Sequence, residues 1–223
     1  MKLSPRVTFI GSGDAFGSGG RLQSCVLVED GGWRCLLDCG ATSLVGLKAA
    51  GVDPASIAAI VISHLHGDHF GGLPFFCLDA QFNSGRRPPL LLVGHADLES
   101  RLRATMELLF PRSAGSLDVV DVRFTQVVPA RVVPIGGDAS VEVFEVDHFC
   151  GSPPFAVRLT TPSGKVIAYS GDTEWTDILI EASRDADLFI AETYFYDKAV
   201  KWHMSYATLA ANLSRISARR VVG

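Results

Sequence analysis

Short apolar runs, each bounded by glycine, proline or polar residues, recur along the chain and predict β-strands. They cover residues 6–10, 25–29, 34–38, 57–62, 90–93, 141–146, 155–160, 166–169 and 188–192, while parts of 117–133 alternate like strands and 219–223 begins another. Longer segments with helical spacing lie between them, at residues 41–50, 73–82, 96–110, 175–183 and 206–216. Each half therefore holds strands followed by helices. This order predicts one domain over residues 1–223, built as a two-sheet sandwich with outer helices.

A glycine-rich loop at residues 11–20 follows the first predicted strand. Gly11 and Gly13 match the start of a dinucleotide-binding fingerprint, but Phe16 stands where its third glycine belongs. No Gly-Lys-Ser/Thr run follows for a P-loop, and the next two apolar runs form a hairpin around residues 30–32 instead of a βαβ unit. We therefore expect a loop that folds over a site, with backbone N–H groups available to an anion.

The composition limits which classes of binding partner and which cellular compartment we expect for this protein. Of the 223 residues, 48% are hydrophobic and 20% charged, which suits a packed core, and the net charge of −4 gives no overall basic field to attract nucleic acid. No apolar run approaches the roughly 20 residues that span a bilayer, and the N-terminus lacks a signal-peptide core, so we expect a cytoplasmic protein with no membrane partner. Five cysteines without C-x-x-C spacing argue against a disulfide framework, so Cys35 and Cys39 are expected to be reduced and buried.

The densest chemistry follows the apolar run at residues 57–62. His64, His66, Asp68 and His69 lie within six residues at the mouth of that predicted strand. Residues two apart in extended backbone point the same way, so His64 and His66 can face one cation together. A turn that starts near His69 would place it with Asp68 in a second half-site. Imidazole and carboxylate donors suit zinc or a similar transition ion, and the alternative is a flexible polar loop with histidines placed by chance.

Four motifs together are typical of one superfamily: G-S-G-D-A-F at residues 11–16, L-D-C-G at 37–40, S-H-L-H-G-D-H-F-G-G-L at 63–73 and S-G-D-T at 170–173. With them the chain resembles, over essentially its whole length, the metallo-β-lactamase superfamily of dinuclear metal hydrolases. It is most similar to the RNase Z branch of tRNA 3′-processing endonucleases and related phosphodiesterases. The resemblance implies an α/β (α+β) fold, a four-layer αββα sandwich of two mixed β-sheets with outer helices. It also implies two divalent metal ions, with zinc favoured over Mn²⁺ or Fe²⁺.

The resemblance adds ligands outside the 63–73 motif. His148, at the end of the predicted strand 141–146, would be the third histidine of one ion, and a buried core histidine is the alternative. Asp172 would bridge the two ions, unless it caps the helix that follows, a task that Thr173 could take. The implied set is His64, His66 and His148 for one ion and Asp68 and His69 for the other, with Asp172 shared.

Other residues receive supporting roles. Asp68 would orient the hydroxide that the two ions share, or accept its proton. In the RNase Z branch a glutamate in an H-E-A-T-like run supports a histidine in an H-S-T-like run. Partial matches place Glu192 and His203 there, and His203 would protonate the leaving group or steady a phosphoryl oxygen. Asp38 ends a predicted strand and either hydrogen-bonds the second nitrogen of a ligand histidine or caps a helix. His95 has no partner spacing and is expected to be a capping or surface residue.

Two departures from the branch refine the expected function. The interval between His148 and Asp172 has no room for the RNA-gripping arm of many tRNA-processing members, which favours a small-molecule or short phosphodiester substrate over tRNA. No histidine follows His203 to match the last ligand of the family, in an L-T-H-like turn, so we expect a truncated sequence. The predicted activity is phosphodiester hydrolysis. The rivals are hydrolysis of a carboxylic or sulfuric ester, thioester, lactone or lactam, and a non-catalytic metal-binding relative; a homodimer is compatible with each.

Overall fold

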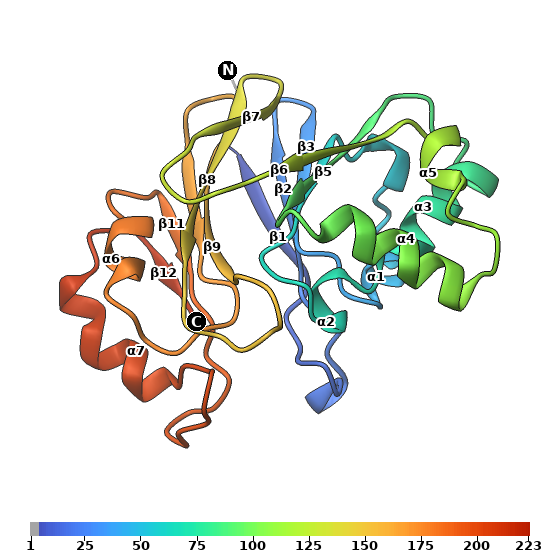
Figure 1. The fold of residues 1–223 in the computed structure, drawn as a ribbon. Coiled ribbons are helices and arrows are strands. Elements are labelled where there is room, and N and C mark those ends of the chain that lie inside the picture. Colours follow the sequence, from blue (N-terminus) through green and yellow to red (C-terminus); the bar gives the residue numbers. More distant parts are fainter. Residues whose placement is uncertain (1–4) are drawn as a thin grey trace. The chain divides into compact units, whose positions relative to one another are not determined.

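The computed structural model describes residues 5–223, and the chain divides into two compact units, Met1–Gln126 and Val127–Gly223 (Figure 1). Each unit is built on one six-stranded sheet accompanied by helices. Both sheets combine parallel with antiparallel pairs. The predicted α/β class with two mixed sheets is therefore confirmed. That residues 1–223 form a single domain stays a prediction.

The sheet of the first unit runs in the order β1-β2-β3-β4-β5-β6. Its first three strands are antiparallel neighbours, with the predicted hairpin turn at residues 31–32, and β3 to β6 are parallel. Parallel neighbours require long crossover connections, and here these connections carry helices. The strands are β1 Arg6–Gly11, β2 Cys25–Asp30, β3 Trp33–Leu37, β4 Ala59–Val61, β5 Leu90–Gly94 and β6 Val122–Gln126.

Helices α1, α3, α4 and α5 lie together on one side of this sheet (Figure 1). They share one core with the sheet, to which Leu36, Ile60, Leu73 and Leu92 contribute fully buried side chains. β4 is buried along its whole length, as its uninterrupted apolar run predicts. The helices are α1 Ser43–Ala49, α2 Gly67–Phe70, α3 Leu73–Phe82, α4 Leu98–Leu109 and α5 Ser116–Val119, with 3₁₀ turns at Ser18–Gly20 and Pro54–Ser56.

The second unit carries a sheet in the order β12-β11-β10-β9-β8-β7. Strands β7 to β10 are antiparallel, whereas β10, β11 and β12 are parallel. Its core contains Ala156, Ala168, Leu179 and Phe189, from the sheet and helix α6. The elements are β7 Val133–Gly136, β8 Ala139–Glu145, β9 Phe155–Thr160, β10 Val166–Tyr169, α6 Ile178–Ala182, β11 Leu188–Ile190, α7 Tyr206–Asn212, a 3₁₀ turn at Leu213–Arg215 and β12 Val221–Val222.

The strands expected across residues 117–133 are only partly present. β6 and the first residue of β7 are extended, but the beginning of the segment forms helix α5. Leu117 and Val120 are buried three residues apart, whereas the side chain of Val119 is exposed. In a strand Leu117 and Val119 would share a face, so this burial pattern requires the helical spacing.

In the glycine-rich loop at residues 11–20, an internal carboxylate accepts hydrogen bonds from two of the backbone N–H groups. The carboxylate of Asp14 accepts hydrogen bonds from the N–H groups of Phe16 and Ser18 at 3.1 and 2.9 Å, and from the Ser18 hydroxyl at 2.6 Å. The bond from the Ser18 hydroxyl, followed by that from its N–H, lowers the pKa of the Asp14 carboxyl. An aspartate inside the loop therefore already occupies two of the N–H groups, and anion binding by the rest of the loop stays a prediction.

All five cysteines are free and buried, which includes Cys35 and Cys39, the two for which burial was predicted. Burial raises the pKa of the Cys25 and Cys77 thiols to about 12, which disfavours the thiolate that binds metals or attacks electrophiles. Within residues 5–223, no helix combines the length and the apolar character that crossing a bilayer requires.

Candidate metal centre

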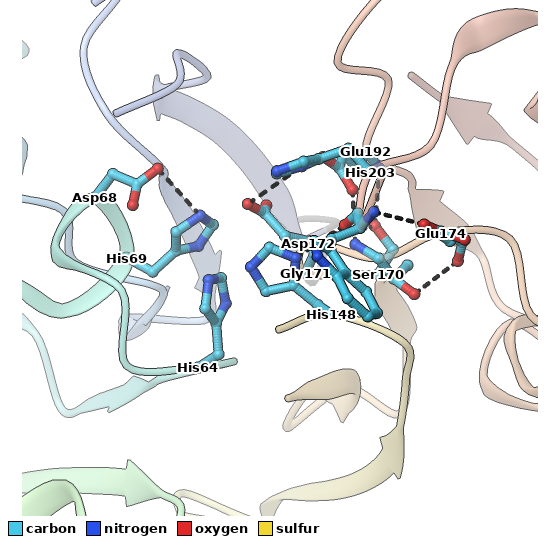
Figure 2. A network of polar contacts seen from close by, with 12 residues as sticks. His64, Asp68, His69, His148, Ser170, Gly171, Asp172, Glu174, Glu192 and His203 are labelled. Atoms are coloured by element: carbon cyan, nitrogen blue, oxygen red, sulfur yellow. Dashed lines mark hydrogen bonds and ion pairs between the residues drawn. The ribbon is translucent and has the colours of Figure 1, made fainter. Parts of the chain in front are cut away.

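The first group of donors lies where β4 ends. The strand delivers Ser63 and His64 to the mouth of the sheet, and His66 stands at the N-cap of the one-turn helix α2, which carries the other two donors. The His64 ring centroid lies 4.9 Å from that of His66 and 4.1 Å from that of His69. Figure 2 shows His64, Asp68 and His69 on this part of the first unit. We call His64, His66, Asp68 and His69 the histidine cluster.

The carboxylate of Asp38 holds the histidine cluster in place through hydrogen bonds to Ser63 and His69. It follows β3, is fully buried, and adopts the left-handed backbone conformation with φ of 60°. Its carboxylate accepts hydrogen bonds from the N–H and the hydroxyl of Ser63, at 2.7 and 2.8 Å, and is bonded to Nδ1 of His69 at 2.7 Å. The sequence left two interpretations of Asp38 open. The structure shows the bond to a histidine, and the N-cap of α1 is Thr42 instead.

These bonds determine which ring nitrogen holds the proton. An ionised carboxylate only accepts, so Nδ1–H of His69 donates to Asp38. The hydroxyl of Ser63 also donates to Asp38, so its oxygen accepts from Nδ1 of His64 at 3.1 Å. Nε2 of His64 and His69 then carries the lone pair that coordinates a metal ion. The Asp68 carboxylate lies 3.6 Å from Nε2 of His69, so an oxygen and a nitrogen donor lie side by side.

The L-D-C-G and H-G-D-H-F-G-G motifs pack directly against each other through their backbones. The N–H of Cys39 donates to the carbonyl of His69, and the N–H of Gly72 donates to the carbonyl of Cys39, at 2.6 and 2.8 Å. A Cβ on Gly40 would meet the carbonyl oxygen of Asp68 at 2.2 Å, and one on Gly72 would meet the Gly40 carbonyl oxygen at the same distance. Only glycine fits at either place, so the two motifs fix the position of the histidine cluster.

The second group of donors lies in the second unit. His148 follows β8, Asp172 follows β10, and His203 precedes α7. One ligand atom from each lies within 4.8 Å of the others, and the two histidine ring centroids are 5.1 Å apart. Figure 2 shows these side chains turned toward one another, with Glu192 beside His203. The structure thus brings together, within this unit, residues that are distant in sequence.

His148 is held by the backbone of Trp202. A carbonyl only accepts, so Nδ1–H of His148 donates to the Trp202 carbonyl at 2.8 Å and Nε2 carries the lone pair. Trp202 has a φ of 71°, a conformation that a bulky residue rarely adopts. Its N–H donates to the Glu174 carboxylate at 2.6 Å, which fixes this peptide. No sequence motif marks Trp202 or Glu174 for these roles.

Glu192 and His203 form the pair that the partial motif match suggested. Nδ1 of His203 is hydrogen-bonded to one carboxylate oxygen of Glu192, while the N–H of Thr173 donates to the other at 2.7 Å. Nδ1 of His203 also lies 3.8 Å from the Asp172 carboxylate, and its ring stacks on that of Tyr194 with centroids 4.8 Å apart. Burial raises the pKa of the Glu192 carboxyl to about 7, although the bond from His203 opposes the shift. A carboxyl of this kind can share a proton with its histidine near neutral pH.

Neither Asp172 nor Thr173 caps the helix that follows. Helix α6 begins at Ile178 with Asp177 at its N-cap, so the helix expected at residues 175–183 is shorter than predicted. Trp175 Nε1–H donates to the Asp177 carboxylate at 3.2 Å in the segment before it. The capping alternative for Asp172 is thereby removed, and the proposed capping role of Thr173 is wrong. The Thr173 hydroxyl instead accepts from the N–H of Asp147 at 3.1 Å, next to His148.

His95 has the local role that its sequence context favoured. It follows β5, and its Nδ1 accepts a hydrogen bond from the N–H of Asp97 at 3.2 Å. The bond closes a turn before helix α4.

The donor chemistry fits a transition metal ion in both units. The first unit offers two imidazoles with the lone pair on Nε2, His64 and His69, beside the Asp68 carboxylate, and the second unit offers Nε2 of His148 beside the Asp172 carboxylate. Zinc, manganese and iron accept such nitrogen and oxygen sets. The three Nδ1 partners are a carboxylate, a hydroxyl and a backbone carbonyl. Groups of these kinds orient ligating histidines in metal sites.

Comparison with known proteins agrees with this chemistry. A family model described as Anti-Pycsar protein Apyc1 matches residues 5–221. The chain is 26% identical over 269 residues to the Ribonuclease Z of Methanosarcina acetivorans, covering 97% of this chain and 86% of the relative. It is 39% identical over 165 residues to the Anti-Pycsar protein Apyc1 of Saccharibacillus brassicae, covering 73% and 65%. The crystal structure of human tRNase Z, short form, is similar with a TM-score of 0.80 and 24% identity, over 98% of this chain and 91% of that chain.

The chain also has the fold of the metallo-β-lactamase fold protein YhfI from Bacillus subtilis, with a TM-score of 0.74 and 23% identity over 97% of this chain and 84% of that chain. The fold and the donor clusters, taken with these likenesses, define the class: the chain is a metal-dependent hydrolase with the metallo-β-lactamase fold. Within the superfamily it belongs to the Anti-Pycsar Apyc1 family, whose model spans nearly all of its length.

Proposed function

We propose that the chain is a phosphodiesterase that holds two divalent metal ions and hydrolyses a small or short phosphodiester. The observation that carries this proposal is the protonation pattern of its histidines. His64, His69 and His148 each have Nδ1 hydrogen-bonded within the protein, so each carries the lone pair on Nε2. A hydrolase that activates water with a metal needs donors prepared in this way.

The proposed ligands are those that the superfamily resemblance implied. His64, His66 and His148 would hold one ion, Asp68 and His69 the other, and Asp172 would bridge them. Zinc suits this set best, with manganese or iron as alternatives. When bound, such a pair of ions lowers the pKa of a water molecule and stabilises the negative charge on the phosphoryl oxygens.

The side chains of the protein itself would then position the reacting groups and move the protons. Asp68 lies beside Nε2 of His69 and would orient the attacking water and take its proton. His203, held through Nδ1 by Glu192, would keep a proton on Nε2 for the leaving oxygen. Burial of Glu192 strengthens its hydrogen bond to His203, because the protein interior screens electrostatic interactions less than water does.

The family relatives and the local structure both favour a small phosphodiester. Relatives named Ribonuclease Z and Anti-Pycsar protein Apyc1 point to phosphodiester chemistry. The interval from His148 to Asp172 consists of a short loop and the β9–β10 hairpin, with its turn at residues 161–165. That interval holds no arm long enough to grip a folded RNA, and the net charge of −4 adds no general attraction for one. The homodimer and the cytoplasmic location stay predictions.

A substrate panel tests the proposed activity. The chain should hydrolyse bis-p-nitrophenyl phosphate and a 3′,5′-cyclic nucleotide with kcat/KM values at least about 100-fold higher than those for nitrocefin, a lactone and p-nitrophenyl sulfate. The reason is that the site would stabilise the geometry and the negative charge of a phosphoryl-transfer transition state. A 3′-extended tRNA precursor should be a poorer substrate than the short phosphodiesters. The chelator-treated preparation is the control for a contaminating esterase. A clear preference for the lactam, lactone or sulfate would contradict the proposal.

A further inference from the structure

The imidazole of His203 is held at more than one point. Its Nδ1 is hydrogen-bonded to the Glu192 carboxylate, which fixes one atom of the ring but leaves the ring free to tilt about that bond. The ring of Tyr194 stacks on the imidazole, with centroids 4.8 Å apart and an interplanar angle of 29°. The ring of His148 meets it edge to face, with centroids 5.1 Å apart at 70°. These two ring contacts restrict the tilt that the bond to Glu192 allows.

Tyr194 is itself fixed by its neighbours. Its N–H donates to the carbonyl of Met204 at 2.9 Å, and the N–H of Tyr206 donates to the carbonyl of Phe195 at 2.8 Å. These bonds tie the segment that follows β11 to the segment that carries His203. The ring of Phe195 packs edge to face against that of Tyr194, with centroids 4.6 Å apart at 74°. Backbone and side-chain contacts therefore both determine where the tyrosine presents its face to His203.

The orientation of the imidazole matters for the proton that it would donate. With Nδ1 bonded to Glu192, the proton for the leaving oxygen is on Nε2. Nε2 lies off the axis of the bond to Glu192, so a tilt of the ring about that bond moves this proton. A proton donor must lie within hydrogen-bond reach of the oxygen that it protonates, and a misplacement of about 1 Å can cost on the order of 100-fold in rate.

We propose that Tyr194 is a positioning residue for this proton transfer, because its ring holds the imidazole of His203 so that Nε2–H stays directed at the leaving oxygen. This inference rests on the proposed phosphodiesterase function, in which His203 donates that proton. The contact joins two ring faces, so the aromatic ring of Tyr194 supplies the effect and its hydroxyl does not. In this role Tyr194 acts only through His203 and need not touch the substrate.

Two diesters that differ only in their leaving group separate proton donation from the rest of catalysis. Methyl p-nitrophenyl phosphate releases p-nitrophenolate, an anion that is stable near neutral pH. Methyl phenyl phosphate releases phenolate, whose acid has a pKa of about 10 like the tyrosine side chain, so its departure depends on a proton. We expect Tyr194→Leu to lower kcat for the phenyl ester by about 10-fold, with KM and the kcat for the nitrophenyl ester within about twofold of wild type.

Two further variants provide the controls. Tyr194→Phe keeps the ring and removes the hydroxyl, so it should retain the wild-type ratio of the two kcat values. Tyr196→Leu is the matched control, because Tyr196 lies two residues further along and also stacks on an aromatic ring, that of Tyr206, with centroids 5.3 Å apart at 18°. It leaves the ring contacts of His203 in place and should affect neither ester. Bound metal in each preparation should equal that of the wild type.

Equal losses on both esters in Tyr194→Leu, or no loss on either, would overturn the positioning role. A loss in Tyr194→Phe as large as that in Tyr194→Leu would also overturn it, because the ring would then not be the part that acts.

The mobility of the His203 ring provides a measurement that does not depend on turnover. NMR relaxation of the Cε1–H bond of His203, assigned with the His203→Ala variant, reports the order parameter of the ring. Tyr194→Leu should lower it from the value of a rigid group toward the values below about 0.6 that mark flexible ones. A ring equally ordered in the wild type and in Tyr194→Leu would reject the role of Tyr194. If the wild-type chain hydrolysed neither ester, the proposed function would fail, and the mobility would still decide about Tyr194.

Discussion

Replacing His66 with alanine is expected to lower kcat/KM for phosphodiester hydrolysis by about 1,000-fold or more while the fold stays intact. His66 belongs to the histidine cluster, and its ring lies 4.9 Å from that of His64. Its side chain makes no capping hydrogen bond to helix α2 and is only partly buried, so its removal leaves the surrounding core unchanged. Hydrolysis of bis-p-nitrophenyl phosphate, metal content and thermal melting together measure the result.

His95→Ala is the matched control for this experiment. His95 also follows a parallel strand of the first unit, but its contact with Asp97 is confined to a turn. We expect its activity and metal content to stay within about twofold of wild type, because the role of its side chain is a local turn contact and it belongs to none of the proposed ligand sets. Wild-type turnover in the His66→Ala variant would show that the histidine cluster does not support catalysis.

Replacing His203 with alanine should lower kcat by about 100- to 1,000-fold with little change in bound metal. The reason is the hydrogen bond between Nδ1 of His203 and Glu192, which suits a proton donor. Removing that donor raises the barrier for the departure of the leaving oxygen but should leave the proposed ligands in place. Turnover and metal content of the same preparation, measured together, separate these two effects.

Glu192→Gln provides the graded comparison. Glutamine keeps the size of the side chain and one acceptor for His203 but loses the negative charge, so kcat should fall less than in His203→Ala. One ligand atom of His203 lies within 4.8 Å of one from each of His148 and Asp172, which makes a direct role as metal ligand the competing explanation. Loss of bound metal together with activity in His203→Ala would favour that explanation over the proton donor.

The sequence predicts those parts of the fold and the site that are determined by residues close together in the chain. The apolar run that becomes β4 is buried on both faces, and this environment alone explains its composition. His64, His66 and His69 are neighbours in sequence, so strand parity and one helical turn bring them together. The close approach of Gly40 to the backbone of Asp68 explains why the L-D-C-G motif and the histidine motif occur in one chain.

Other features depend on contacts that no local pattern encodes. The carbonyl of Trp202 holds His148 from 54 positions away, and any residue type could supply a carbonyl. Glu174 acts through the N–H of that same tryptophan, so its role is equally invisible in the sequence. In the glycine-rich loop the glycines predict a loop, but the hydrogen bonds from the N–H groups of Phe16 and Ser18 to the Asp14 side chain do not follow from that pattern.

Short amphipathic segments account for the main error in secondary structure. Residues 117–120 carry too few side chains for strand and helical spacing to differ clearly in the sequence. Burial of Leu117 and Val120 in the core of the first unit decides the outcome in favour of helix α5. Tertiary packing therefore determined the conformation where local preference was balanced.

The central claim is that hydrolysis requires metal held by these histidines and carboxylates. Its most direct test is a titration in which Zn²⁺ is returned to chelator-treated protein while bound zinc and hydrolysis of bis-p-nitrophenyl phosphate are recorded together. We predict activity below about 1% of the starting value after chelation, and recovery that follows bound zinc up to about two ions per chain. Undiminished hydrolysis at less than about 0.1 ion per chain would contradict the account.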